Sequence, residues 1–213
     1  MSKRILIIGL TLGLLAGALA MPAEAKKKKK KPPAPPAPVA TVMYMEGTSQ
    51  AGEQDNQADG KFLQLTKDPG TGEKSMGFWG AATSPNPNCA GNGLLPVFVG
   101  GLSGKVVGSL KVTFSAASTP GNSVEVRVWP DIAAQACNES YIEPAGKVTV
   151  PLPAGEGTVE ATIDGLDFSA SGLLMIQINP IGIPPGYARV FYGTDASKVE
   201  FMCVPAAGAS CLP

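Results

Sequence analysis

The sequence predicts an all-β protein, an antiparallel β-sandwich of the jelly-roll type with about ten short strands. Residues 105–131 give the clearest sign, because Leu110, Val112 and Phe114 alternate with polar residues and positions 124–128 repeat the pattern after a loop. The chain also holds 26 Gly and 20 Pro, which favour turns and disfavour helices. No segment shows the spacing of apolar residues that an amphipathic helix requires.

The strand candidates follow one another at short intervals. Each is a short run of apolar, β-branched or aromatic residues between turn formers. Pro96 places the fourth run at a sheet edge or delays its start. Residues 173–178, apolar apart from Gln177, predict a buried central strand. In chain order the candidates are Thr41–Glu46, Phe62–Thr66, Met76–Trp79, Leu94–Val99, 105–115, 124–129, Lys147–Leu152, Gly157–Ile163, Leu173–Ile178, Arg189–Tyr192 and Lys198–Cys203.

The connection between the two strands in 105–129 has two interpretations. A hairpin that pairs Val112 with Val124 sets Lys111 opposite Glu125, which is more favourable than a register with two basic residues opposite each other. Alternatively, the seven residues 116–122 carry the chain from one sheet to the other. In both cases the apolar side of these strands is predicted to be core.

Residues 1–25 are predicted to be a secretory signal peptide. Two basic residues precede an uncharged, mostly apolar run at 5–20, and cleavage sites of the A-x-A type occur at 23–25 and 18–20. The apolar run of 16 residues is shorter than the ~20 that span a bilayer. We therefore expect a secreted or extracellular protein, either free or associated with the cell wall, with no membrane span after cleavage.

Residues 26–39 are predicted to be a Lys/Pro-rich linker, and residues 40–213 a single β-sandwich domain. Lys26–Lys31 repel one another and stay solvated, and the prolines that follow favour an extended, semi-rigid chain. The lysines either contact an anionic polymer or only keep a spacer soluble, and the sequence favours neither.

The folded domain carries the opposite charge to its linker. Nine basic and sixteen acidic residues occur from position 40 onward, a balance of about −7. A protein that reads nucleic acid carries its basic patch on the folded body. No specific nucleic acid is therefore expected as a partner.

Four cysteines behind an export signal indicate disulfides. The favoured pairs are Cys89–Cys137, which would join two long loops, and Cys203–Cys211, which would close a small C-terminal loop. The chain has no His and no C-x-x-C spacing, so these cysteines do not resemble a zinc site.

Catalysis is constrained by the same lack of His, which excludes Ser-His-Asp and Cys-His mechanisms. Paired carboxylates could still hydrolyse glycosides. The candidates are Glu125, Glu160 and Glu200, which lie on predicted strands, but they fit solvated strand faces better. The expected protein is not an enzyme.

A structural Ca²⁺ is the one cofactor that the sequence suggests. Glu53, Asp55, Asn56 and Asp59 are close together in one loop, although their spacing is not that of an EF-hand. If the first and last strands lie side by side, Glu46 or Asp195 would approach this loop and add oxygen ligands.

Trp129 is the candidate ligand-binding residue. Strict alternation turns it to the polar face with Glu125 and Arg127, where an exposed indole could stack on a sugar ring. The alternative is that a bulge near Pro130 tucks the side chain under the following loop.

Several segments resemble β-sandwich modules of secreted bacterial proteins, often found beside subtilisin-like peptidases. The similar segments, which cover about residues 41–205, are NPNCAGN, VTF…STPG…VEVRVWPD, ACNESY…PAGKVTVPLPAG and RVFYGTDASKVEF. The resemblance implies a jelly roll related in shape to carbohydrate-binding and proprotein-convertase P-like domains. It implies no catalytic residues, because such modules supply none.

Together these observations predict a secreted or cell-surface, non-catalytic binding or structural module. Its expected partners are a cell-wall polymer or glycan at the folded domain and an anionic polymer at Lys26–Lys31. The alternatives are a small secreted glycoside hydrolase that uses paired carboxylates and a surface assembly protein whose strand edges pair with a partner.

Overall fold

The computed structural model describes residues 36–47, 63–77, 96–130, 143–181, 188–207 and 209–213. These residues form strands, turns and irregular segments, and none of them lies in a helix. The strands are β1 (Val39–Glu46), β2 (Leu63–Thr66), β3 (Lys74–Gly77), β4 (Val97–Ser118), β5 (Ser123–Trp129), β6 (Gly146–Pro151), β7 (Gly155–Ile181), β8 (Ala188–Tyr192) and β9 (Lys198–Pro205). The predicted all-β, sandwich-like class is confirmed.

Two strands are much longer than the sequence predicts. β4 has 22 residues and β7 has 27, and each joins two runs that turn-forming glycines separate in the sequence. Gly100, Gly101 and Gly104, which separate the two runs of β4, all pair with β7, so the strand continues through them. Within the second run, Gly108 has a φ of 80°, in the left-handed region, and the β4 ladder shifts register between Gly108 and Leu110. The chain therefore bends at a bulge without leaving the sheet.

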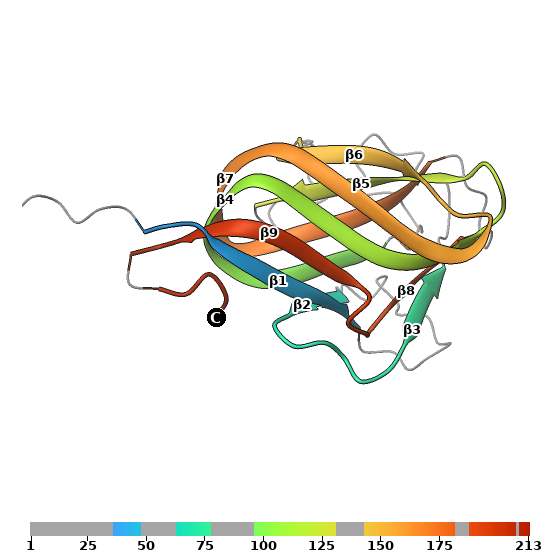
Figure 1. The fold of residues 1–213 in the computed structure, drawn as a ribbon, viewed down its shortest axis with the longest axis horizontal. Helices are drawn as coiled ribbons and strands as arrows, with labels where there is room; N and C mark the ends of the chain where they lie inside the picture. The colour runs from blue at the N-terminus through green and yellow to red at the C-terminus, as the bar shows by residue number, and fades with distance from the viewer. Residues whose placement is uncertain (1–35, 48–62, 78–95, 131–142, 182–187, 208) are drawn as a thin grey trace, which may run out of the picture. The chain divides into compact units, whose positions relative to one another are not determined.

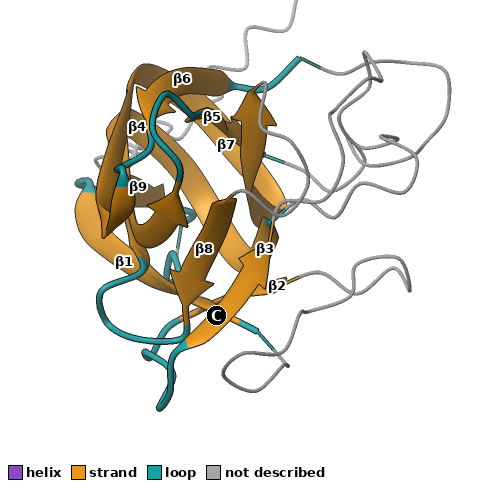
Figure 2. Ribbon diagram, turned by 90° about the vertical axis from the view of Figure 1, so that its right-hand side faces the viewer, coloured by secondary structure: helices purple, strands orange, loops and turns teal. Residues whose placement is uncertain are grey.

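The strands follow the order β2-β1-β9-β4-β7-β5-β6, and β3 joins through β8 (Figures 1 and 2). β4 is central. β7 pairs along one edge of β4, while β2, β9 and β8 pair in turn along its other edge. All pairs are antiparallel except β2–β4.

β4 and β5 do not form a hairpin. β5 pairs with β6 on one edge and with the second half of β7 on the other, so neither hairpin register considered for Val124 occurs. The turn at 119–122 instead leads from β4 to β5, which lie on either side of β7 in the strand order of one sheet. β6 packs against the first half of β7, where Gly146 faces Ile163 and Leu166.

The core lies between the inner faces of these paired strands. Phe114 of β4, Val126 of β5 and Ile178 of β7 are fully buried in one cluster, as alternation predicts. The rings of Phe98 and Tyr192 pack edge to face with centroids 5.5 Å apart. No helix within the described ranges is long and apolar enough to cross a membrane.

A candidate binding surface on the outer face of β5 and β7

A row of polar side chains lies on the outer face of β5 and β7. The odd-numbered residues of β5 point away from the core, because Val124, Val126 and Val128 between them are buried. The register sets Glu125 opposite Asn179 and Arg127 opposite Gln177. We call Glu125, Arg127, Gln177 and Asn179 the polar row.

Arg127 is the centre of the polar row. Its Nε donates to Glu125 Oε1 at 2.5 Å, and its Nη1 lies 3.4 Å from Gln177 Oε1. The Arg127 and Glu125 side chains are 14% and 17% exposed, so both are mostly covered but still reach solvent. A guanidinium held on two sides presents its remaining donors in a fixed direction.

Asn179 adds an acceptor that no described group uses. The residue is 5% exposed, and its Oδ1 has no hydrogen-bond partner within the described part of the chain. A buried acceptor without a partner costs about 1–3 kcal/mol, so its presence points to a donor that comes from elsewhere. Together with Arg127, it offers the donors and acceptors that hydroxyl groups need.

Trp129 lies at the end of the same face. It packs with Val97 and Met175 in a small apolar cluster, against which Val99 also packs, and its exposed fraction is 0%. As alternation predicts, Trp129 lies outside the main core cluster. Its side chain is nevertheless buried, as the second interpretation expects, and is not an exposed surface for a sugar ring. Its contact with a ligand stays a prediction.

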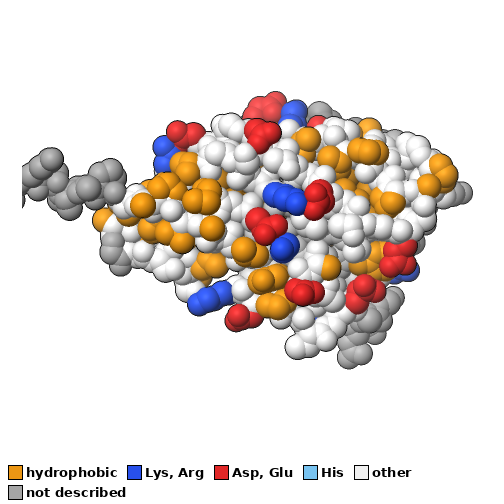
Figure 3. Space-filling model, in the orientation of Figure 1, with side chains coloured by type: hydrophobic (Ala, Val, Ile, Leu, Met, Phe, Trp, Pro, Cys, Tyr) orange, Lys and Arg blue, Asp and Glu red, His pale blue; other side chains and the backbone are white. Residues whose placement is uncertain are grey.

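Two of the three glutamates of the hydrolase alternative share one face, and Glu125 lies apart from them. Glu160 and Glu200 lie on the outer face of β7, β4 and β9, where Glu160 accepts from Lys111 at 2.6 Å and Glu200 lies 3.3 Å from Lys198. Figure 3 shows basic and acidic side chains side by side in the middle of this face. Glu125 instead belongs to the polar row. A lysine beside a carboxylate is typical of surface ion pairs, whereas general acids occupy apolar surroundings.

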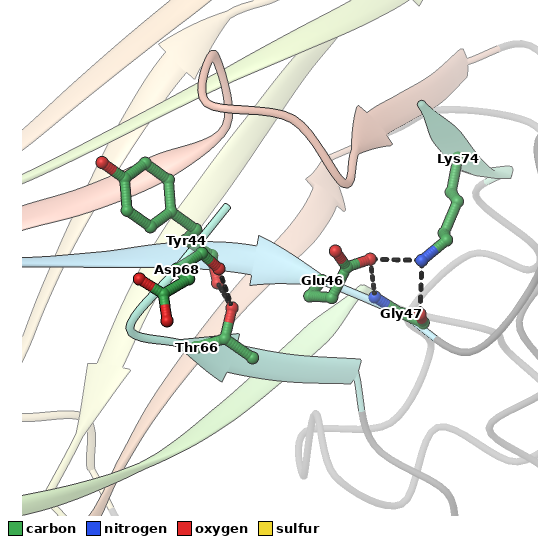
Figure 4. A network of polar contacts seen from close by, with 6 residues as sticks. All are labelled: Tyr44, Glu46, Gly47, Thr66, Asp68 and Lys74. Atoms are coloured by element: carbon green, nitrogen blue, oxygen red, sulfur yellow. Dashed lines mark hydrogen bonds and ion pairs between the residues drawn. The ribbon is translucent and has the colours of Figure 1, made fainter. Parts of the chain in front are cut away.

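Glu46, one predicted calcium ligand, lies at the end of β1 in an ion pair. Glu46 Oε1 accepts from Lys74 Nζ and from the Gly47 N–H at 2.9 Å, and Lys74 Nζ also donates to the Gly47 carbonyl at 2.7 Å (Figure 4). The Glu46 and Lys74 side chains are 16% and 20% exposed. Its carboxylate therefore already has a cationic partner, which the sequence analysis missed.

The other predicted calcium ligands are not brought together in the described chain. The pairing of β1 with β9 confirms that the first and last strands lie side by side. It brings the β8–β9 turn to the end of β1, where Gly193 N donates to Met45 O at 2.9 Å. Asp195 in that turn is exposed. Glu53, Asp55, Asn56 and Asp59 lie outside the described residues, which contain no cluster of three potential metal ligands. Calcium binding stays a prediction.

One predicted disulfide is confirmed. Cys203 and Cys211 are bonded, with Cα atoms 6.3 Å apart and a sequence separation of 8, and their residues are 0% and 6% exposed. Cys89 and Cys137 lie outside the described residues, so their pairing stays a prediction.

Sequence reasoning missed half of the polar row. Gln177 stood out as the single polar residue in an apolar run, which was a usable signal that a polar group is buried there. Asn179 gave no such signal, because its position opposite Glu125 depends on a pairing between distant strands.

Comparison with known proteins supports the fold alone. No family model matches the sequence, and no curated protein matches it. The structure is similar to a CocE/NonD family hydrolase from Staphylococcus aureus, with a TM-score of 0.50 and 8% identity over 79% of this chain. It is also similar to an aminopeptidase from a marine sediment archaeon, Thaumarchaeota archaeon, with a TM-score of 0.50 and 10% identity over 78% of this chain. The chain spans 37% of the length of each protein, so the likeness is that of a shared β-fold over part of each protein.

Proposed function

We propose that this chain is a secreted or cell-surface, non-catalytic binding module that holds a glycan or cell-wall polymer on the outer face of β5 and β7. The observation that carries the proposal is the buried Asn179 Oδ1, which has no partner among the described residues and lies opposite Glu125, the residue that anchors the Arg127 guanidinium. A hydroxyl-rich polymer supplies donors to the Asn179 oxygen and acceptors to the Arg127 guanidinium.

The polar row suits such a ligand because the strands fix it. Each of its four residues lies on a paired strand, so little conformational entropy would be lost on binding. The apolar cluster around Trp129 lies at the end of the same face and is buried, so it supports the strands that carry the polar row. The solved proteins of similar fold contribute nothing to the choice of ligand.

The export signal and the lysines complete the proposal. A signal peptide at 1–25 would deliver the chain to the extracellular side, and Lys26–Lys31 would add an electrostatic contact with anionic wall polymer. A Ca²⁺ bound near Glu46 would be structural and separate from the polar row.

The test is a binding array of soluble glycans and cell-wall polymers, probed with the purified chain with and without Ca²⁺. We expect at least one polymer to bind, and Glu125→Gln to weaken that binding by about tenfold, because Arg127 loses a charged partner worth about 1.5 kcal/mol. Glu160→Gln is the matched control, since it neutralises a paired strand glutamate on the other outer face. Equal effects of the two substitutions would refute the site, and release of reducing sugar from a bound polymer would refute the non-catalytic assignment.

A further inference from the structure

One edge of β1 is only half paired. β9 pairs with β1 over Val39–Tyr44 on one side, while β2 covers the other side only over Tyr44–Glu46. No strand within the described residues pairs with that second edge between Val39 and Met43. An unpaired strand edge is a template for another extended chain.

The backbone groups that face this open edge can be identified. Met45 N donates to Ser197 O at 2.9 Å, so the N–H and C=O of Met45 point to the β9 side. In an antiparallel strand these directions alternate from residue to residue. Ala40 and Val42 therefore direct their N–H and C=O groups to the open edge.

A groove of about 410 Å³ lies along this edge. Residues 39–42, Lys67, Pro205 and residues 209–212 line it. We call the part formed by Pro205 and residues 209–212 the C-terminal wall. At one end the Thr66 hydroxyl donates to the Tyr44 carbonyl at 3.3 Å, which closes the edge there (Figure 4).

The C-terminal wall of the groove is fastened to the fold. The disulfide ties Cys211 to Cys203 of β9, and Ser103 N donates to the Cys211 carbonyl at 2.9 Å. These two links hold a short irregular segment against β4 and β9. The groove is therefore built before any ligand arrives.

The chemistry of the groove selects an extended peptide. Donors and acceptors that alternate at strand spacing are complementary to a peptide backbone, and few other ligands match them. Lys67 is exposed at the rim and takes part in none of the ion pairs between described residues. A nearby acidic side chain of the ligand would pair with it.

We propose that this groove binds an extended acidic peptide segment of another protein by β-strand addition to Ala40 and Val42. The peptide would run antiparallel or parallel to β1, with an acidic side chain toward Lys67 and apolar side chains against the C-terminal wall. This site is separate from the polar row, and it stands if glycan binding fails.

The probe is a pool of acetylated and amidated heptapeptides in which Val or Thr alternates with Glu, titrated against the purified full chain. We expect saturable binding that slows amide hydrogen exchange at Ala40 and Val42. Only every second N–H of the bound peptide faces β1. N-methylation of that set of nitrogens should therefore abolish binding, and N-methylation of the other set should spare it. The proposal would be overturned if no peptide of the pool bound, or if methylation of neither set of nitrogens affected binding.

Two substitutions separate the contribution of backbone pairing from that of charge. Val42→Pro removes an N–H that no β9 bond uses, so the fold should survive while peptide binding is lost. Lys67→Glu leaves the backbone untouched and should weaken binding by at least about tenfold, with a gain for peptides in which Lys replaces Glu. Self-association of the free chain that Val42→Pro abolishes would overturn the assignment of another protein as the occupant, since the groove would then hold a second copy.

Discussion

Asn179 is a residue at which stability and ligand binding should conflict. Replacing it in Asn179→Leu removes the buried acceptor that has no described partner. We expect the free energy of unfolding to rise by about 1 kcal/mol. Polymer binding should fall, because the ligand loses an acceptor. Urea unfolding and affinity measurements on the same variant test both expectations.

Thr113 supplies the matched control for this experiment. Its Oγ1 is also buried without a described partner, but it lies on the other outer face, opposite Glu160. Thr113→Val should stabilise the protein in the same way and leave polymer binding unchanged. If the two variants changed binding alike, Asn179 would have no special role.

Gly193 shows how closely the β8–β9 turn approaches its neighbours. Its φ is 89°, and a Cβ built there would lie 2.3 Å from the Gly72 carbonyl oxygen. Gly193→Ala should therefore lower the free energy of unfolding by about 2–4 kcal/mol, the sum of a left-handed backbone and an overpacked contact. Thermal and urea unfolding measure the loss.

The substitution Gly121→Ala measures the cost of the left-handed backbone alone. Its φ is 85°, and a Cβ there would meet nothing within 4 Å. Gly121→Ala should cost only about 1–2 kcal/mol. A loss at Gly121 as large as that at Gly193 would show that the contact with Gly72 contributes nothing.

Among the elements, the C-terminal segment depends most on a single bond. Cys203→Ala with Cys211→Ala should lower the free energy of unfolding by about 2–3 kcal/mol, the value for a loop this short. The segment also forms one wall of the groove, so peptide affinity should fall with it. Unfolding curves and peptide titration of the double variant measure the two effects, and unchanged peptide affinity would show that the wall does not contribute.

Strand faces could be predicted from the sequence, but strand continuity could not. Alternation correctly placed Leu110 and Phe114 inside and Arg127 outside, since side-chain direction is local. The glycines in β4 and β7 look like turn formers, and only long-range pairing shows that they are bends within a strand. For the same reason the partners of Arg127 on β7 could not be foreseen.

For the whole molecule, the separation of charge between linker and domain is the feature to test. The folded body carries about −7, so we expect any contact with an anionic polymer to depend on the positive charge of Lys26–Lys31. Replacing these six lysines with Gln should reduce retention on anionic wall polymer at about 0.15 M salt, with little difference at 1 M. Cosedimentation with the polymer at both salt concentrations measures the retention.

The polar row gives the control for this charge effect. Glu125→Gln should change the binding of the specific polymer without changing the salt dependence that the lysines supply. If retention of the lysine variant equalled that of the natural chain at low salt, the linker would be only a spacer.

The pairing of β1 with β9 has a mechanical consequence. The chain ahead of Val39 leads directly into β1, whose residues 39–44 are paired with 203–198 of β9. Tension applied through that end acts along β1, at right angles to the hydrogen bonds that hold it. These bonds would have to break together rather than in sequence, and the disulfide at Cys203 reinforces the loaded end. Such a domain should resist forced unfolding, because the rate of unfolding under tension is set by the step in which all the β1–β9 hydrogen bonds break.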